Sequence, residues 1–184
     1  MTPTRPVRLA ADLARSLSLS EAAKKLLAPE HTPRQYFDAL AAQPTLAEDA
    51  IRFLACALPK REAVGWALAC VRSAVPKPSP EAAKAIAAAE AWVKEPSEVN
   101  RRACGAAGEG AGHGTAPGCL ADAAFWSGGS LSAPHLPPAP PRDDLTASAV
   151  AAAVLLAAVI DPATAPAHRS RFVALGADIA SGRK

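Results

Sequence analysis

The sequence predicts an all-α fold, a compact multi-helix array of eight to ten short helices with a central Ala-rich apolar helix. Half of the 184 residues are hydrophobic and 47 residues are Ala, the best helix former. Val, Ile and Thr together number only 21 and aromatic residues make up 4%, so strands are disfavoured. The larger aliphatic side chains suffice for one core.

Helix boundaries follow from the 18 prolines and from the 3.6-residue period of apolar side chains. Thr32-Pro33, Leu58-Pro59 and Ser79-Pro80 are typical helix starts, and Thr and Ser are good N-caps. We expect helices over residues 6–17, 20–28, 33–43, 45–57, 59–75, 80–95, 97–107, 117–127, 145–160 and 166–181.

The whole chain, residues 1–184, is expected to form a single helical domain. It begins with an N-terminal helical segment, residues 1–43. Six glycines predict a mobile Gly-rich loop over 105–118, and residues 128–143 form a Gly-Gly hinge and a Pro-rich arm. The piece after the arm is too small to hold a core alone, so 145–182 is read as a C-terminal helix pair packed back on the core.

The segment 145–160 is apolar on all sides. A membrane span needs about 20 apolar residues, and this segment is shorter and bounded by Asp144 and Asp161. We therefore expect it to be the most buried helix of the domain, without membrane insertion.

Charge and cysteine content indicate an ordinary cytoplasmic protein. The net charge is +3 and no basic run is long enough for a nucleic-acid tail, so no nucleic-acid partner is expected. The beginning of the chain lacks an uninterrupted apolar stretch of the secretory type. The four cysteines form no CxxC pair and are expected to be buried thiols in a reducing compartment.

No motif predicts catalysis, a cofactor or a metal. The four His residues lie in no GxSxG, HExxH or similar pattern. Cys104, His113 and Cys119 flank the glycines, but zinc needs a fourth ligand. Because 103–141 contains no Lys or Arg, the glycine run is not a phosphate-binding loop.

At two positions the sequence departs from the usual residue preferences at helix ends. Lys60 and Arg61 begin a helix without an N-cap, where cations oppose the helix dipole. Trp126 ends a helix beside the Gly-Gly hinge, where it either clamps the arm or offers a groove to a partner peptide. Such conflicts are typical of functional positions.

We therefore predict a partner-binding surface that contains these two places. Glu62 and Trp66 are four residues apart and share a helix face, turned away from the inward stripe that Val64 begins. Alternatively, Glu62 pairs with Arg101 or Arg102 and Trp66 is a core residue. The predicted partner-binding residues are Lys60, Arg61, Glu62, Trp66, Trp92, Arg101, Arg102 and Trp126.

Four stretches, LPKREAV followed by Trp66, AWV..PSE.NRR, FWSGGSL and AVLLAAV, occur in this order. With them the chain resembles a family of uncharacterised bacterial all-helical domains over most of 45–182. The resemblance implies a compact helical fold and gene neighbourhoods with type VI secretion and forkhead-associated-domain proteins. It implies no activity, cofactor or catalytic residue.

Together these observations predict a non-enzymatic cytoplasmic protein-protein interaction or accessory module, linked through the resemblance to a bacterial secretion system. Its protein partner is not identified by the sequence. The alternative is an enzyme or binding protein for a small anionic ligand held by Lys60, Arg61, Arg101 and Arg102. That alternative requires the four side chains to converge on a pocket.

Overall fold

The computed structural model describes residues 9–182, and within this range the chain folds into ten α-helices and one 3-10 helix with no strand. The all-α prediction is confirmed. The helices are α1 Ala10–Ala14, α2 Glu21–Lys25, α3 Pro33–Ala41, η1 Pro44–Leu46, α4 Ala47–Ala57, α5 Lys60–Ala74, α6 Pro80–Lys94, α7 Glu98–Ala111, α8 Ala116–Phe125, α9 Leu145–Ala158 and α10 Ala165–Ala180.

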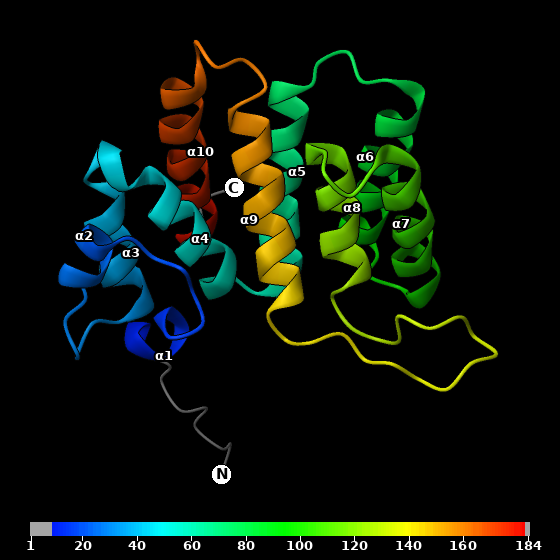
Figure 1. The fold of residues 1–184 in the computed structure, drawn as a ribbon, viewed down its shortest axis with the longest axis horizontal. Helices are drawn as coiled ribbons and strands as arrows, with labels where there is room; N and C mark the ends of the chain where they lie inside the picture. Colours follow the sequence, from blue (N-terminus) through cyan, green and yellow to red (C-terminus); the bar gives the residue numbers. More distant parts are fainter. Residues whose placement is uncertain (1–8, 183–184) are drawn as a thin grey trace.

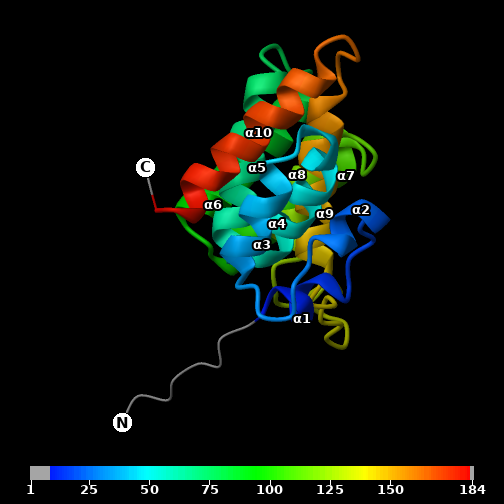
Figure 2. The ribbon, with the colours of Figure 1, turned by 90° about the vertical axis from the view of Figure 1, so that its left-hand side faces the viewer.

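Helices α5 and α9 lie side by side at the centre (Figure 1). On one side they contact α4 and α10, and α1 and α3 pack beyond α4. On the other side α8 packs against both central helices and α6 packs against α5, with α7 beyond them (Figure 1). Figure 2 shows α10 running along the outside of α5 and the α3–α4 pair. The predicted central position of the Ala-rich helix is therefore confirmed.

The predicted helix starts follow from local hydrogen bonds. Thr32 forms a capping box with Gln35 and precedes Pro33, and the Ser79 hydroxyl accepts from the backbone N–H of Ala82. Helix α5 begins at Lys60 after Pro59. The expected helix 6–17 is shorter, Ala10–Ala14, and its residues 6–8 lie outside the described residues.

The Gly-rich loop expected over 105–118 is wrong, because α7 continues to Ala111 and leaves only residues 112–115 as a turn. Glycine in this stretch serves close packing between α7 and α8. A Cβ at Gly105 would lie 3.0 Å from the Phe125 ring, and one at Gly108 would lie 2.8 Å from Asp122 Oδ1. Helix α8 thus makes tertiary contacts that outweigh the low helix propensity of glycine.

The most buried helix is α8, not the segment 145–160. Nine of the ten residues of α8 are buried, against eight of fourteen in α9. Leu155 and Leu156 of α9 remain partly exposed, and Val159 and Ile160 just beyond it are 41% and 53% exposed. Among the described residues, no helix combines the length and apolar character needed to cross a membrane.

Trp66 lies in the centre of the core. Its side chain is fully buried, and its indole N–H donates to the main-chain oxygen of Phe172 at 2.9 Å. Helix α10 approaches closely here because position 176 is glycine: a Cβ at Gly176 would lie 2.3 Å from Leu54 Cδ2. Helix α5 is therefore buried on two sides between layers, and Trp66 is not exposed to a partner.

Candidate functional site

Three of the predicted cations bind the chain that leaves α8. Lys60 Nζ donates to the carbonyl oxygen of Ser127 at 2.9 Å. Arg101 and Arg102 donate to carbonyl oxygens between Phe125 and Ser132. This chain runs from the end of α8 to the start of α9, residues 126–144, and extends below the helices in Figure 1. The basic residues thus fix the base of the Pro-rich arm.

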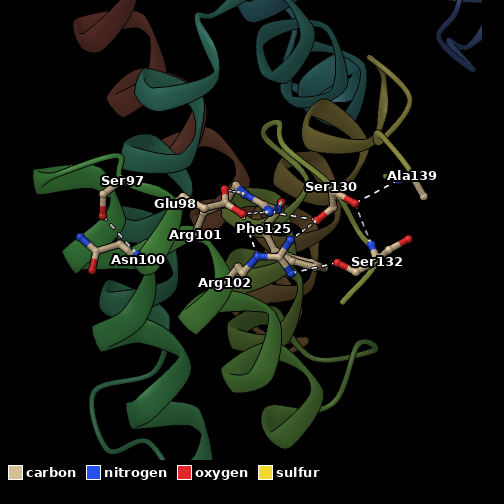
Figure 3. Close-up of polar contacts among 9 residues, drawn as sticks. All are labelled: Ser97, Glu98, Asn100, Arg101, Arg102, Phe125, Ser130, Ser132 and Ala139. Carbon is tan, nitrogen blue, oxygen red and sulfur yellow. Dashed lines mark hydrogen bonds and ion pairs between the residues drawn. The ribbon is translucent and has the colours of Figure 1, made fainter. Parts of the chain in front are cut away.

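Arg101 is the centre of this arrangement (Figure 3). Its side chain is only 5% exposed, and it forms a two-pronged ion pair with Glu98, Nε to Oε2 at 2.6 Å and Nη2 to Oε1 at 2.7 Å. Both residues belong to α7, three positions apart, so the helix presents them on one face. Burial of the guanidinium is tolerated because most of its donors are satisfied.

The remaining donors of Arg101 reach across to the arm. Nη1 donates to the carbonyl oxygen of Phe125 at 2.6 Å and Nη2 to that of Ser130 at 2.9 Å. The guanidinium carbon also lies 4.9 Å from the centre of the Phe125 ring, a cation–π distance. Gly129 has φ +63° and passes so close that a Cβ there would lie 2.8 Å from Nη2. Only glycine fits both the conformation and the space.

Arg102 and Thr146 complete the set of side chains that holds the start of the arm, here called the anchor: Lys60, Glu98, Arg101, Arg102 and Thr146. Arg102 donates from Nε to Glu98 at 2.8 Å and from Nη1 to the carbonyl oxygen of Ser132 at 3.0 Å. Thr146, in the first turn of α9, donates its hydroxyl to the carbonyl oxygen of Trp126 at 2.9 Å. Side chains of α5, α7 and α9 therefore together hold five carbonyl groups of this stretch, those of Phe125, Trp126, Ser127, Ser130 and Ser132.

Glu98 is the residue of this site that sequence reasoning missed. It accepts from both arginines, and the hydrogen bond from Arg101 is the main cause that lowers its pKa to about 2. The spacing Glu98, Arg101 and Arg102, at i, i+3 and i+4 on one helix, is the signal that could have identified it. The expected pairing of Glu62 with Arg101 or Arg102 is wrong, since Glu98 takes that place.

Residues 130–141, here called the proline loop, close on themselves beyond this anchor. The N–H of Leu131 donates to the carbonyl oxygen of Ala139 at 2.8 Å. The Ser130 hydroxyl accepts from the N–H groups of Ser132 and Ala139 at 3.1 and 3.0 Å. Residues 134–140 are exposed, and Leu136 is 52% exposed. The loop therefore has a fixed base and an open tip.

The other predicted residues differ in burial and in hydrogen-bond partners. Arg61 donates to the carbonyl oxygens of Val93 and Lys94 at 2.6 and 2.8 Å, so it caps the C-terminus of α6. Glu62 is exposed, while Trp92 is 5% exposed. The partner-facing exposure expected of Trp66, Trp92 and Arg101 is wrong, because all three are buried.

Trp126 is half-buried against the core, at the junction between α8 and the arm. The four cations of the predicted anion site do not direct free donors into one pocket: Lys60 and Arg61 bind main-chain oxygens, and Arg101 and Arg102 bind Glu98 as well as main-chain oxygens. No observation therefore favours the small-anion alternative.

Cys104, His113 and Cys119 do not form a ligand set. Burial raises the pKa of Cys104 to about 12 and also raises that of Cys119, so both remain protonated thiols. Cys119 donates to the main-chain oxygen of His113 at 3.0 Å. Within the part of the chain that the structure describes, no group of three or more His, Cys, Asp or Glu residues could hold a metal ion.

His113 instead pairs with Asp122, across the short turn between α7 and α8. Nδ1 lies 2.8 Å from Asp122 Oδ2, with the His side chain 63% exposed and the Asp side chain 3% exposed. The hydrogen bond with Asp122 raises the pKa of His113, and burial raises that of Asp122 although His113 lowers it. The pair fixes the turn that the sequence predicted as a mobile loop.

A comparison with protein families matches residues 36–180 to DUF6931, a family of unknown function. The chain belongs to this family. The match of DUF6931 runs from α3 to α10 and includes the anchor and the whole proline loop. No curated protein and no solved structure matches the chain.

Proposed function

We propose that this DUF6931 protein is a non-enzymatic, cytoplasmic interaction module that presents the proline loop to a protein partner. The observation that carries the proposal is the contrast between the base and the tip of the loop. Arg101, Arg102 and Lys60 hold the base, whereas the tip, with Leu136 half exposed, extends from the helical body. A rigidly held exposed loop is typical of binding segments on a stable scaffold.

The cytoplasmic location is part of the proposal. Cys70, Cys104 and Cys119 are buried and form no disulfide. Buried reduced thiols are typical of a reducing compartment. The link to a bacterial secretion system also belongs to the proposal and rests only on what the sequence resemblance implies about gene neighbourhoods. A component of such an apparatus would be one partner for the loop.

Capture of partners from the native cell tests the proposal. The tagged full chain is compared with Leu136→Asp and with the matched control Val99→Asp, which changes an apolar side chain 78% exposed on α7. We expect Leu136→Asp to lose its partner at an unchanged melting temperature, while Val99→Asp retains it. Identical protein sets from all three baits would contradict the proposal.

A further inference from the structure

We propose that the proline loop binds in a groove of the partner protein that is lined with aromatic side chains, as in the recognition of proline-rich peptides. The inference rests on the proposed function and adds the chemistry of the partner's site. It depends on the backbone of residues 133–141, on their exposure and on the absence of charge along them.

The tip of the loop combines a turn with a proline run. The N–H of Leu136 donates to the carbonyl oxygen of Ala133 at 2.9 Å, which closes a turn with Pro134 at its second position. Four of the next five residues are proline: Pro137, Pro138, Pro140 and Pro141. Their rings fix φ near −65°, and a residue that precedes a proline is disfavoured in the helical region, so this run favours polyproline II-like backbone.

The spacing of these prolines matches a proline-recognition ligand. Polyproline II has three residues per turn, so Pro137 and Pro140 share one edge, and Pro138 and Pro141 share another. Aromatic-lined grooves bind such Pro-x-x-Pro pairs through the proline rings. Pro137, Pro138 and Pro140 are exposed, and Leu136 adds a larger apolar side chain directly before them.

The loop is also held in position before binding. Ala139, the one residue of 137–141 that has an N–H group, donates to Ser130 Oγ and accepts from the N–H of Leu131. Ser130 is in turn held by Arg101. A peptide that is already restrained loses less conformational entropy on binding. The anchor and the proline rings both reduce this entropy loss, so together they favour binding of the loop to the partner protein.

Charge favours a protein groove over other classes of macromolecule. Residues 130–141 contain no Lys, Arg, Asp or Glu, and His135 is their one titratable side chain, so the loop offers no permanent cation to a phosphate backbone or an anionic membrane. Beyond it, Arg142 is paired with Asp144 at 2.7 Å. A surface of proline rings, one leucine and the imidazole of His135 is best matched by Trp and Tyr faces.

The test places a photoactivatable residue, p-benzoylphenylalanine, at exposed position His135 in the full chain, with the same residue at Val99 as the control. After irradiation in native cells, the crosslinked protein is identified and the linked peptide is mapped. We expect one protein captured from position 135 alone, linked within a face that carries at least two Trp or Tyr residues. A face without aromatic residues, or a second copy of this chain, would overturn the inference.

The captured protein is then purified and titrated with three chains: wild type, Pro137→Ala/Pro138→Ala, and the control Pro76→Ala/Pro78→Ala, which changes two exposed prolines between α5 and α6. We expect the first double variant to bind at least tenfold more weakly and the second to bind as wild type. All three should share one melting temperature.

The outcomes separate the two proposals. Equal binding by both double variants would leave the interaction module intact and remove proline recognition. Capture of no protein from position 135, with the crosslinker shown to be active on the purified chain, would remove both.

Discussion

Helix α8 has a loop at each end, and the two loops are fixed by opposite electrostatic arrangements. Before α8, the turn 112–115 is held by a buried acid, Asp122, and an exposed base, His113. After α8, the arm is held by a buried base, Arg101, and an exposed acid, Glu98. Guanidinium keeps its charge at all accessible pH values, whereas imidazole titrates near neutrality. The arm after α8 is therefore held by a base that stays charged, and the turn before α8 is held by a base that titrates.

The largest expected effect comes from removing the permanent charge. Arg101→Met keeps the length of the side chain but leaves the carbonyl oxygen of Phe125 without its donor and that of Ser130 with only the longer bond from Arg102 Nη2, at 3.4 Å. We expect the free energy of unfolding to fall by about 3 kcal/mol. The control Arg102→Met removes a side chain that is 30% exposed and should cost about 1 kcal/mol or less. Equal losses in urea denaturation would show that Arg101 is not the centre of the anchor.

The second prediction concerns the backbone that passes over Arg101. Gly129→Ala introduces a Cβ at φ +63° and 2.8 Å from the guanidinium. We expect a loss of about 2 kcal/mol, because strain and overlap add. At neighbouring Gly128 the described residues leave the Cβ position open within 4 Å, so Gly128→Ala should change stability by less than about 0.5 kcal/mol. Thermal unfolding of both variants distinguishes the positions.

The third prediction compares two glycines of α7, one of which lies next to Asp122, the partner of His113. Gly108→Ala places a Cβ 2.8 Å from Asp122 Oδ1 and should destabilise the chain by about 1 kcal/mol after its gain in helix propensity. Gly110 lies in the same helix with no described heavy atom within 4 Å of its Cβ position. Gly110→Ala should therefore stabilise by up to about 1 kcal/mol. A stabilised Gly108→Ala chain would mean that α7 and α8 separate easily.

The smallest expected effect is a difference in pH dependence. The pKa of His113 is raised above 6.5 by Asp122, with a smaller contribution from Glu109. Its contribution to stability is complete below pH 6.5 and is lost as pH rises through the folded-state pKa. Glu98 behaves oppositely: its pKa is lowered from 4.5 to about 2, so its contribution is complete above pH 4.5 and is lost as pH falls toward 2.

Between pH 6 and 8 the turn should therefore weaken while the anchor does not. Unfolding curves at several pH values check this, and His113→Asn should remove the decline above pH 6.5. A decline of the same size in His113→Asn would assign it to another group. A histidine NMR titration of the wild-type chain gives the folded-state pKa of His113 directly.

Composition and helix-start signals were enough to predict the all-α class and most of the helices, since Ala content, Pro-preceding caps and apolar stripes are local properties. The glycines of α7 were misread as a loop because the contacts that require them are not local: a Cβ at Gly105 or Gly108 would crowd Phe125 or Asp122 of α8. A glycine count alone does not distinguish a loop from a close helix contact.

The residues of the anchor were predicted in part, but with another role. The sequence singled out Lys60, Arg101 and Arg102 as partner-binding residues, and the structure brings them together on the chain that contains the Gly-Gly hinge. Their acceptors are main-chain carbonyl groups, which carry no residue-type signal, so the sequence could not show that the cations hold the arm. Burial of Trp66 depends on α10, whose approach is decided by Gly176.

The contact between Trp66 and Phe172 has a consequence for synthesis of the chain on the ribosome. The two residues are 106 positions apart, and the indole N–H has its acceptor only once Phe172 has been made. At roughly 5–20 residues per second, this leaves an interval of roughly 5–20 s. During that time the nascent chain carries an indole not yet covered by α10, so α10 completes the burial of a side chain made about 100 residues earlier.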